Sequence, residues 1–159
     1  MRAVIGLGSN LGDRLATLRS AVVAIGQAGI LRARSSVYET EALLGPSQGP
    51  QPPFLNAAVL LETGLAPETV LDELLAIERA HGRVRREKWG ARTLDLDILW
   101  IDGMRVHTDR LTVPHPRLHE RAFALRPLLD VVPGAKDPET RSVYRLTTGN
   151  AITKVADSL

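Results

Sequence analysis

The sequence predicts an α+β fold: a ferredoxin-like α/β sandwich with a mainly antiparallel sheet, an appended hairpin and extra C-terminal elements. Its apolar and turn residues mark out strand, helix, strand, strand, helix and strand in that order, which is the split β-α-β pattern. The chain of 159 residues has 44% apolar content and no long low-complexity tract. These values predict one globular domain over residues 1–159. The split β-α-β pattern predicts that the helices lie on one face of the sheet.

The N-terminal region predicts a short buried strand followed by a helix. Residues 3–8 are apolar or glycine, and Asp13 stands where it can cap a helix over Arg14 to Gln27. The joining segment, Gly6 to Gly12, has neither the G-x-G-x-x-G spacing of a dinucleotide site nor the Gly-Lys-Ser/Thr ending of a phosphate loop. We interpret its glycines as easing a tight turn between strand and helix.

Two more strands are predicted before the second helix, around residues 34–38 and over residues 55–63. Residues 43–53 between them are rich in glycine and proline, which disfavour regular hydrogen-bonded structure. A loop of this length inside a compact domain is more often functional or mobile than idle. Pro67 then opens a helix that ends near Gly82.

Smaller elements follow the last core strand. A turn at residues 102–103 leads into a small hairpin over residues 106–112. Residues 117–129 predict a short helix or turn that Pro127 limits. A C-terminal helix is predicted from about Val143 onward.

Composition and charge exclude several kinds of protein. The chain has no cysteine, so it holds neither a disulfide framework nor a thiolate zinc site. A net charge of +2 and 4% aromatic residues disfavour a nucleic-acid-binding surface. No secretory peptide or membrane-spanning apolar stretch is recognisable, so we expect a cytoplasmic protein that binds neither nucleic acid nor membrane.

The most informative motif is the Asp-x-Asp pair at the start of the last core strand. Strand side chains alternate between faces, so Asp95 and Asp97 project from the same side of residues 95–101. Two neighbouring carboxylates repel each other unless a positive charge lies between them, and a divalent cation supplies that charge. The alternative is an ordinary strand whose aspartates face the solvent.

The segment just before this strand is strongly basic, and it favours a divalent-cation site over solvent-facing aspartates. Five cations lie within ten residues, at Arg83, Arg85, Arg86, Lys88 and Arg92, and Trp89-Gly90 interrupts them. Arginine side chains bind phosphate oxygens in two-pronged geometry, and Mg²⁺ bridges carboxylates to phosphates. An anionic phosphate ligand, a magnesium ion and two carboxylates are therefore predicted together.

A second polar segment surrounds two histidines. His115 and His119 stand four residues apart, but Pro116 disfavours the helix that would bring both onto one metal ion. We interpret His115 as a contact for an anion and His119 as exposed. Arg110 and Arg121 bracket the segment and either extend a phosphate-binding surface or are simply solvated.

Three aromatic residues adjoin these polar segments. Phe54 follows the proline-rich loop and Phe123 follows the histidines, so each is either a core residue or one side of a clamp for a flat heterocycle. Trp89 lies inside the charged loop and fits a ligand cover better than a core position.

Three stretches of the chain together resemble one family. They are Gly8 to Asp13, the run from Gly82 through Trp89-Gly90 and Arg92-Thr93-Leu94-Asp95-Leu96-Asp97-Ile98, and Leu111 to His115. The family is 6-hydroxymethyl-7,8-dihydropterin pyrophosphokinase, an enzyme of folate biosynthesis. Segments 44–46 and 54–58 agree with it as well, so the resemblance spans most of the chain.

The resemblance implies an ATP- and magnesium-dependent diphosphotransferase that forms the pterin diphosphate and AMP, working as a monomer with two Mg²⁺ ions. Asp95 and Asp97 would bind the metal, and the arginine loop would close over the site. The implied residues are Arg83, Arg92, Asp95 and Asp97 for catalysis, Arg85, Trp89, Ile98, Arg110, Thr112, His115 and Arg121 for ATP, and Leu44, Gly45, Phe54, Asn56, Trp89 and Phe123 for the pterin.

The sequence departs from the family pattern in three places. Phe54 stands where the family often has tyrosine, which preserves stacking, and Pro116 replaces a tyrosine that could contact ATP. Residues 41–43 replace a more proline-rich stretch. Two other classes remain open: a noncatalytic ligand-binding or metal-binding module, and an RNA-binding sheet.

Overall fold

The computed structural model describes residues 1–41, 52–82, 93–146 and 152–159. Within these residues the chain forms a mixed α/β structure around one sheet, with a small separate hairpin. The elements are β1 (Arg2–Ser9), α1 (Arg14–Ile25), η1 (Gly26–Ala28), β2 (Ile30–Arg34), β3 (Val37–Thr40), β4 (Phe54–Glu62), α2 (Pro67–Ala80), β5 (Asp95–Ile101), β6 (Val106–His107), β7 (Thr112–Val113), η2 (Leu118–Glu120), α3 (Ala122–Val131) and β8 (Thr153–Ala156).

The sheet has the strand order β5-β1-β4-β3-β8, and β2 also pairs with β4. Every strand pairing in the described residues is antiparallel. The mainly antiparallel sheet predicted from the sequence is therefore confirmed. β1 lies between β4 and β5, so residues from these three strands share rows across the sheet.

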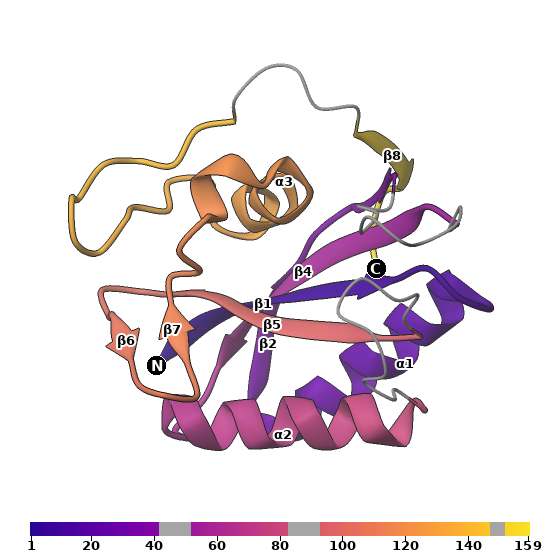
Figure 1. Ribbon diagram of the computed structural model, residues 1–159, viewed down its shortest axis with the longest axis horizontal. Coiled ribbons are helices and arrows are strands. Elements are labelled where there is room, and N and C mark those ends of the chain that lie inside the picture. Colours follow the sequence, from indigo (N-terminus) through magenta and orange to yellow (C-terminus); the bar gives the residue numbers. More distant parts are fainter. Residues whose placement is uncertain (42–51, 83–92, 147–151) are drawn as a thin grey trace.

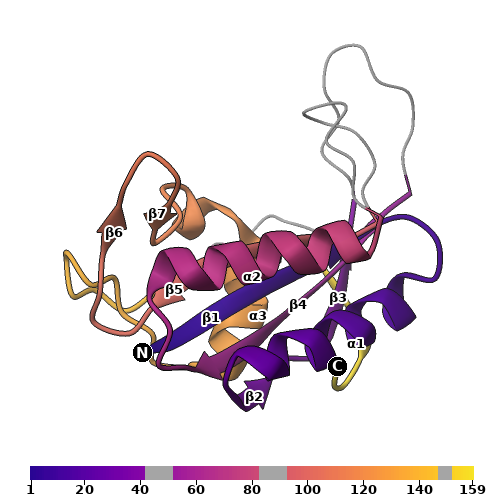
Figure 2. The same ribbon diagram turned by 90° about the horizontal axis from the view of Figure 1, so that it is seen from below.

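Helices cover both faces of this sheet, as Figures 1 and 2 show: α1 and α2 lie on one face and α3 lies on the other. The prediction of helices on one face only was wrong. Apolar side chains of α3, including Leu125 and Leu128, pack with Val4, Leu60 and Trp100 in a second core cluster. The apolar face of α3 was not predicted, because polar residues precede Ala122 and Pro127 lies inside the helix.

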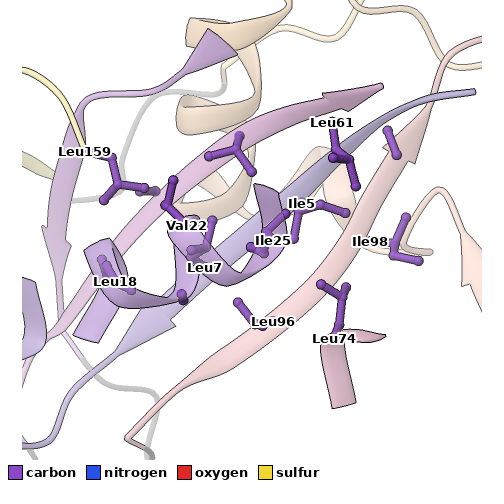
Figure 3. Close-up of a cluster of buried hydrophobic side chains, with 14 of the residues drawn as sticks. Ile5, Leu7, Leu18, Val22, Ile25, Leu61, Leu74, Leu96, Ile98 and Leu159 are labelled. Carbon is purple, nitrogen blue, oxygen red and sulfur yellow. The ribbon is translucent and has the colours of Figure 1, made fainter. Parts of the chain in front are cut away.

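The larger core cluster lies between the sheet and the pair α1 and α2 (Figure 3). Asp13 caps α1 as predicted, because its Oδ1 accepts the Ala16 N–H at 3.1 Å. The hydrophobic side chains that pack here come from several strands, β1, β4 and β5 among them, and from both helices, and include Ile5, Leu18, Leu74 and Leu96. This cluster fixes β5 against α2, which matters for the aspartates on that strand.

Three predicted elements differ from the structure. The single strand around residues 34–38 is two strands, β2 and β3, separated where the Ser36 N–H donates to Asp130 Oδ2 at 3.2 Å instead of to a strand. Pro127 lies inside α3 rather than limiting it. The C-terminal helix predicted from Val143 is absent from the described residues, and β8 extends the sheet edge there, as its β-branched residues favour.

Candidate active site

The two aspartates of β5 lie on the same face of the sheet, as predicted. Leu94, Leu96 and Ile98 point to the opposite face and pack in the larger core cluster. Asp95 is half-buried and Asp97 is exposed, so the pair opens toward solvent rather than lying fully inside. Two carboxylates with access to solvent supply oxygen ligands of the kind that Mg²⁺ prefers, leaving positions for water and phosphate oxygens.

A buried glutamate of α2 supports the strand between these aspartates. Glu78 is 2% exposed, and its Oε2 accepts the Leu96 N–H at 2.8 Å. The bond holds the peptide at the centre of the Asp-x-Asp motif. Glu78 was not among the residues predicted from the sequence, although it follows Leu74 by four positions and therefore stands on the apolar stripe of α2.

Pairing across the sheet brings an amide close to the carboxylates. Gly8 of β1 is opposite Asn56 of β4 on one side and opposite Asp95 of β5 on the other. Gly6 is likewise opposite Asp97. Partners in an antiparallel pair project to the same face, so Asn56 and both aspartates face the same way. The two glycines of β1 that lie between them have no side chain on this face.

Asn56 is held in place by its neighbours. Its side chain belongs to a residue that is 8% exposed, and its Nδ2 donates to Thr40 Oγ1 at 2.8 Å. Phe54 precedes it by two positions and is half-buried on the same face. This part of the site therefore offers a fixed amide beside an aromatic ring.

A network ties β3, which carries Thr40, to α3. The Tyr38 hydroxyl donates to Asp130 Oδ2 at 2.5 Å and accepts from Arg126 Nε at 3.1 Å. Burial is the main cause that raises the pKa of Tyr38. A buried tyrosine thus joins β3 to α3.

Phe123 and Arg121 lie at the start of α3. Phe123 is half-buried against the second core cluster, and the guanidinium of Arg121 lies 5.7 Å from the centroid of its ring. Their element covers the same face of the sheet that carries Asn56, because Ala58 and Leu60 pack with α3. The structure therefore brings both phenylalanines to one face.

His115 lies beside β5. Its N–H donates to Leu99 O at 3.3 Å, and its Nδ1 accepts the Arg117 N–H at 3.2 Å. The second contact leaves Nε2 as the ring nitrogen that carries the proton of the neutral form. Burial, followed by the charges of Arg121 and Arg117, lowers the pKa of His115.

The hairpin β6–β7 is joined to α2 by ion pairs. Arg110 pairs with Asp72 and, at 3.8 Å, with Glu68, while Thr108 Oγ1 donates to Glu68 Oε1 at 2.7 Å. These side chains are about half exposed. Thr112 belongs to β7, next to this docked edge.

The remaining predicted residues have different outcomes. Ile98 is 4% exposed in the larger core cluster, and His119 is exposed as expected. Gly12 has a positive φ of 67° and does serve the turn, but Gly6 and Gly8 lie within β1, so that part of the glycine interpretation was wrong. Outside the described residues lie Leu44, Gly45, Arg83, Arg85, Trp89 and Arg92.

The described residues contain neither a ready-made metal cluster nor a membrane-spanning helix. No group of three or more histidine, cysteine, aspartate or glutamate side chains that could hold a metal ion occurs there. No helix among them is long and apolar enough to cross a membrane.

Comparison with known proteins identifies the family. A profile of the 7,8-dihydro-6-hydroxymethylpterin-pyrophosphokinase (HPPK) family matches residues 4–133. A 2-amino-4-hydroxy-6-hydroxymethyldihydropteridine pyrophosphokinase of Synechocystis sp. is 42% identical over 87% of this chain and 70% of its own length. The corresponding protein of Methylorubrum extorquens is 44% identical over 83% of each chain. A mitochondrial folate synthesis bifunctional protein of Arabidopsis thaliana is 44% identical, over 86% of this chain and 24% of its own.

Solved structures agree on the fold. An HPPK-DHPS structure in complex with substrates superposes with a TM-score of 0.68 at 14% identity, over 91% of this chain and 42% of that one. A Plasmodium falciparum HPPK-DHPS gives a TM-score of 0.65 over 94% of this chain and 44% of its own. This chain therefore spans less than half of these two-part proteins. On the profile and the curated relatives, the chain belongs to the 7,8-dihydro-6-hydroxymethylpterin-pyrophosphokinase family.

Proposed function

We propose that this chain transfers the diphosphate of ATP to the hydroxymethyl group of 6-hydroxymethyl-7,8-dihydropterin, with Asp95 and Asp97 as its metal ligands. The row that places Asn56, Gly8 and Asp95 side by side carries the proposal, because it joins a heterocycle-binding amide to a carboxylate pair. Its relatives are named as pyrophosphokinases of the same pterin.

The reaction forms one bond and breaks another. The hydroxymethyl oxygen attacks the β-phosphorus of ATP, the bond from that phosphorus to the α-phosphate oxygen breaks, and AMP leaves with that oxygen. The hydroxyl proton is released to solvent or to a phosphate oxygen. Two Mg²⁺ ions, when bound, would neutralise the triphosphate charge between the aspartates and the substrate.

The pterin half of the proposal uses Asn56 and the two phenylalanines. Asn56 offers both a donor and an acceptor to the edge of the ring, while Phe54 and Phe123 stack on its faces. Leu44, Gly45 and Trp89 complete this half as predictions outside the described residues.

The nucleotide half uses the hairpin and the segment before α3. Arg110, Thr112, His115 and Arg121 hold phosphates and the nucleoside, and a neutral His115 donates through Nε2. Arg83, Arg85 and Arg92 are predictions outside the described residues. The Ile98 side chain is buried in the larger core cluster, so only its backbone remains for a contact with ATP. Both core clusters pack on one sheet, which supports a single pyrophosphokinase domain over residues 1–159.

Product analysis tests the activity. The purified chain, incubated with ATP, Mg²⁺ and the hydroxymethyl pterin, is expected to give AMP and pterin diphosphate. Asp97→Asn should lower kcat by at least about a hundredfold while leaving the melting temperature close to that of the wild type, since a charge-stabilising group is lost from the transition state. Formation of ADP, or full activity of Asp97→Asn, would overturn the proposal.

Three finer predictions remain. They are the ferredoxin-like description of the fold, a monomeric state and a cytoplasmic location. Light scattering of the purified chain decides the second of these.

A further inference from the structure

Gly8 is the residue that separates the two halves of the proposed site. It lies within β1, buried, with Asn56 on one neighbouring strand and Asp95 on the other. Its backbone φ is not in the left-handed region, so the local conformation does not require glycine. Another reason must account for a residue without a side chain at this point.

The space above Gly8 gives that reason. A Cβ at this position would lie 3.3 Å from Asn56 Oδ1 and 3.7 Å from Phe54 Cδ1. The second distance is an ordinary contact. The first is tight, so the amide oxygen of Asn56 would have to move by a few tenths of an ångström.

Asn56 has little freedom to make that move. Its Nδ2 donates to Thr40 Oγ1 at 2.8 Å, and the residue is 8% exposed. A buried amide that shifts loses hydrogen-bond geometry, which costs more than the same shift at the surface. The position of the Asn56 amide therefore depends on two neighbours: Gly8 leaves room for its Oδ1, and Thr40 binds its Nδ2.

We propose that Gly8 is a positioning residue for the pterin: it acts through Asn56, whose amide can lie at the depth that the substrate edge requires only because β1 has no side chain there. The inference rests on the proposed function. The nucleotide and metal contacts lie on other residues, so an added methyl group at position 8 should affect one substrate and spare the other.

Substitution Gly8→Ala tests this selectivity. The probes are 6-hydroxymethyl-7,8-dihydropterin, titrated with Mg²⁺ and a non-hydrolysable ATP analogue present, and the analogue titrated alone with Mg²⁺. We expect the Kd of the pterin to rise at least tenfold and the Kd of the analogue to stay within twofold. Gly64→Ala is the matched control, because its Cβ would meet open space, and it should change neither value.

A double-mutant cycle tests the route through Asn56. Asn56→Ala alone should weaken pterin binding, and adding Gly8→Ala to it should cost less than a further twofold, because the amide that the methyl group displaces is gone. If Gly8→Ala fails to fold, the double variant should regain folding for the same reason. A double variant that also fails to fold would overturn the inference.

The outcomes separate this inference from the function on which it rests. Wild-type protein that binds no pterin refutes the proposed function. Wild-type binding with an unchanged Gly8→Ala refutes the inference alone, and so does a tenfold loss that persists in the Asn56→Ala background. A loss that affects the ATP analogue equally indicates a general structural role and also refutes it.

Discussion

The two halves of the proposed site, the pterin side and the nucleotide side, are held in different ways. On the pterin side, the buried Asn56 donates to Thr40 at 2.8 Å, and the buried Tyr38 of the same strand as Thr40 donates to Asp130 at 2.5 Å. On the nucleotide side, Arg110 is held to α2 by ion pairs whose side chains are about half exposed. Buried hydrogen bonds define one geometry, whereas exposed ion pairs contribute little free energy and exchange partners readily. The pterin side is therefore preformed, and the nucleotide side can rearrange around phosphate.

The largest effect is expected at Glu78, which supports the strand shared by both halves. Glu78→Leu leaves the buried Leu96 N–H without its acceptor and should lower the free energy of unfolding by about 1–3 kcal/mol. The Mg²⁺ concentration for half-maximal activity should rise as well. Glu78→Gln keeps an acceptor oxygen and serves as the control. Urea unfolding and a Mg²⁺ titration measure both effects, and a Leu variant equal to the Gln variant would contradict the role.

A smaller effect is expected at Thr40, on the preformed side. Thr40→Val removes the acceptor for Asn56 Nδ2 and should weaken pterin binding by roughly fivefold, which corresponds to about 1 kcal/mol. Calorimetric titration with the pterin checks this value. The Kd of an ATP analogue should not change; if it changes in parallel, the two halves are not independent.

Asp72, on the rearranging side, should give a still smaller effect of opposite sign. Asp72→Asn frees Arg110 from one competing carboxylate, so the KM for ATP should fall by roughly twofold at low ionic strength. The difference in KM between the variant and the wild type should vanish at about 0.5 M salt, because such an ionic strength screens interactions between exposed charges. Steady-state kinetics at two salt concentrations decide it. A raised KM would mean that Asp72 orients Arg110 instead of competing for it.

The smallest effect concerns the pH dependence of stability near His115. Because burial and two arginines lower its pKa, the unfolded chain binds a proton at this residue that the folded chain does not. The stability from His115 is thus present above its ordinary pKa and declines as the pH falls through and below that value. Unfolding free energies at pH 7.5 and pH 5.5 should differ more for the wild type than for His115→Gln. Equal differences would show that His115 titrates normally.

The aspartate pair was predictable because strand alternation is a local rule, and residues 95–98 carry their own pattern of exposure. The glycines of β1 were not, since their meaning depends on which residues of β4 and β5 lie opposite them. Glu78 could have been found from its place on an apolar helix stripe. α3 was predicted only as a short helix or turn, because Pro127 argued against a longer helix. In the structure Pro127 is buried inside α3, and the helix packs its apolar side chains, Leu125 and Leu128 among them, in the second core cluster.

The absence of a side chain at Gly8 has a consequence for how this chain can vary. Every replacement at this position adds at least one carbon atom, so it has no conservative substitute, whereas Gly64 has open space around it. In a saturation library selected for growth that depends on this activity, position 64 should accept many residues and position 8 should accept almost none. The contrast between the two positions would show by genetics alone that the space at Gly8 is needed.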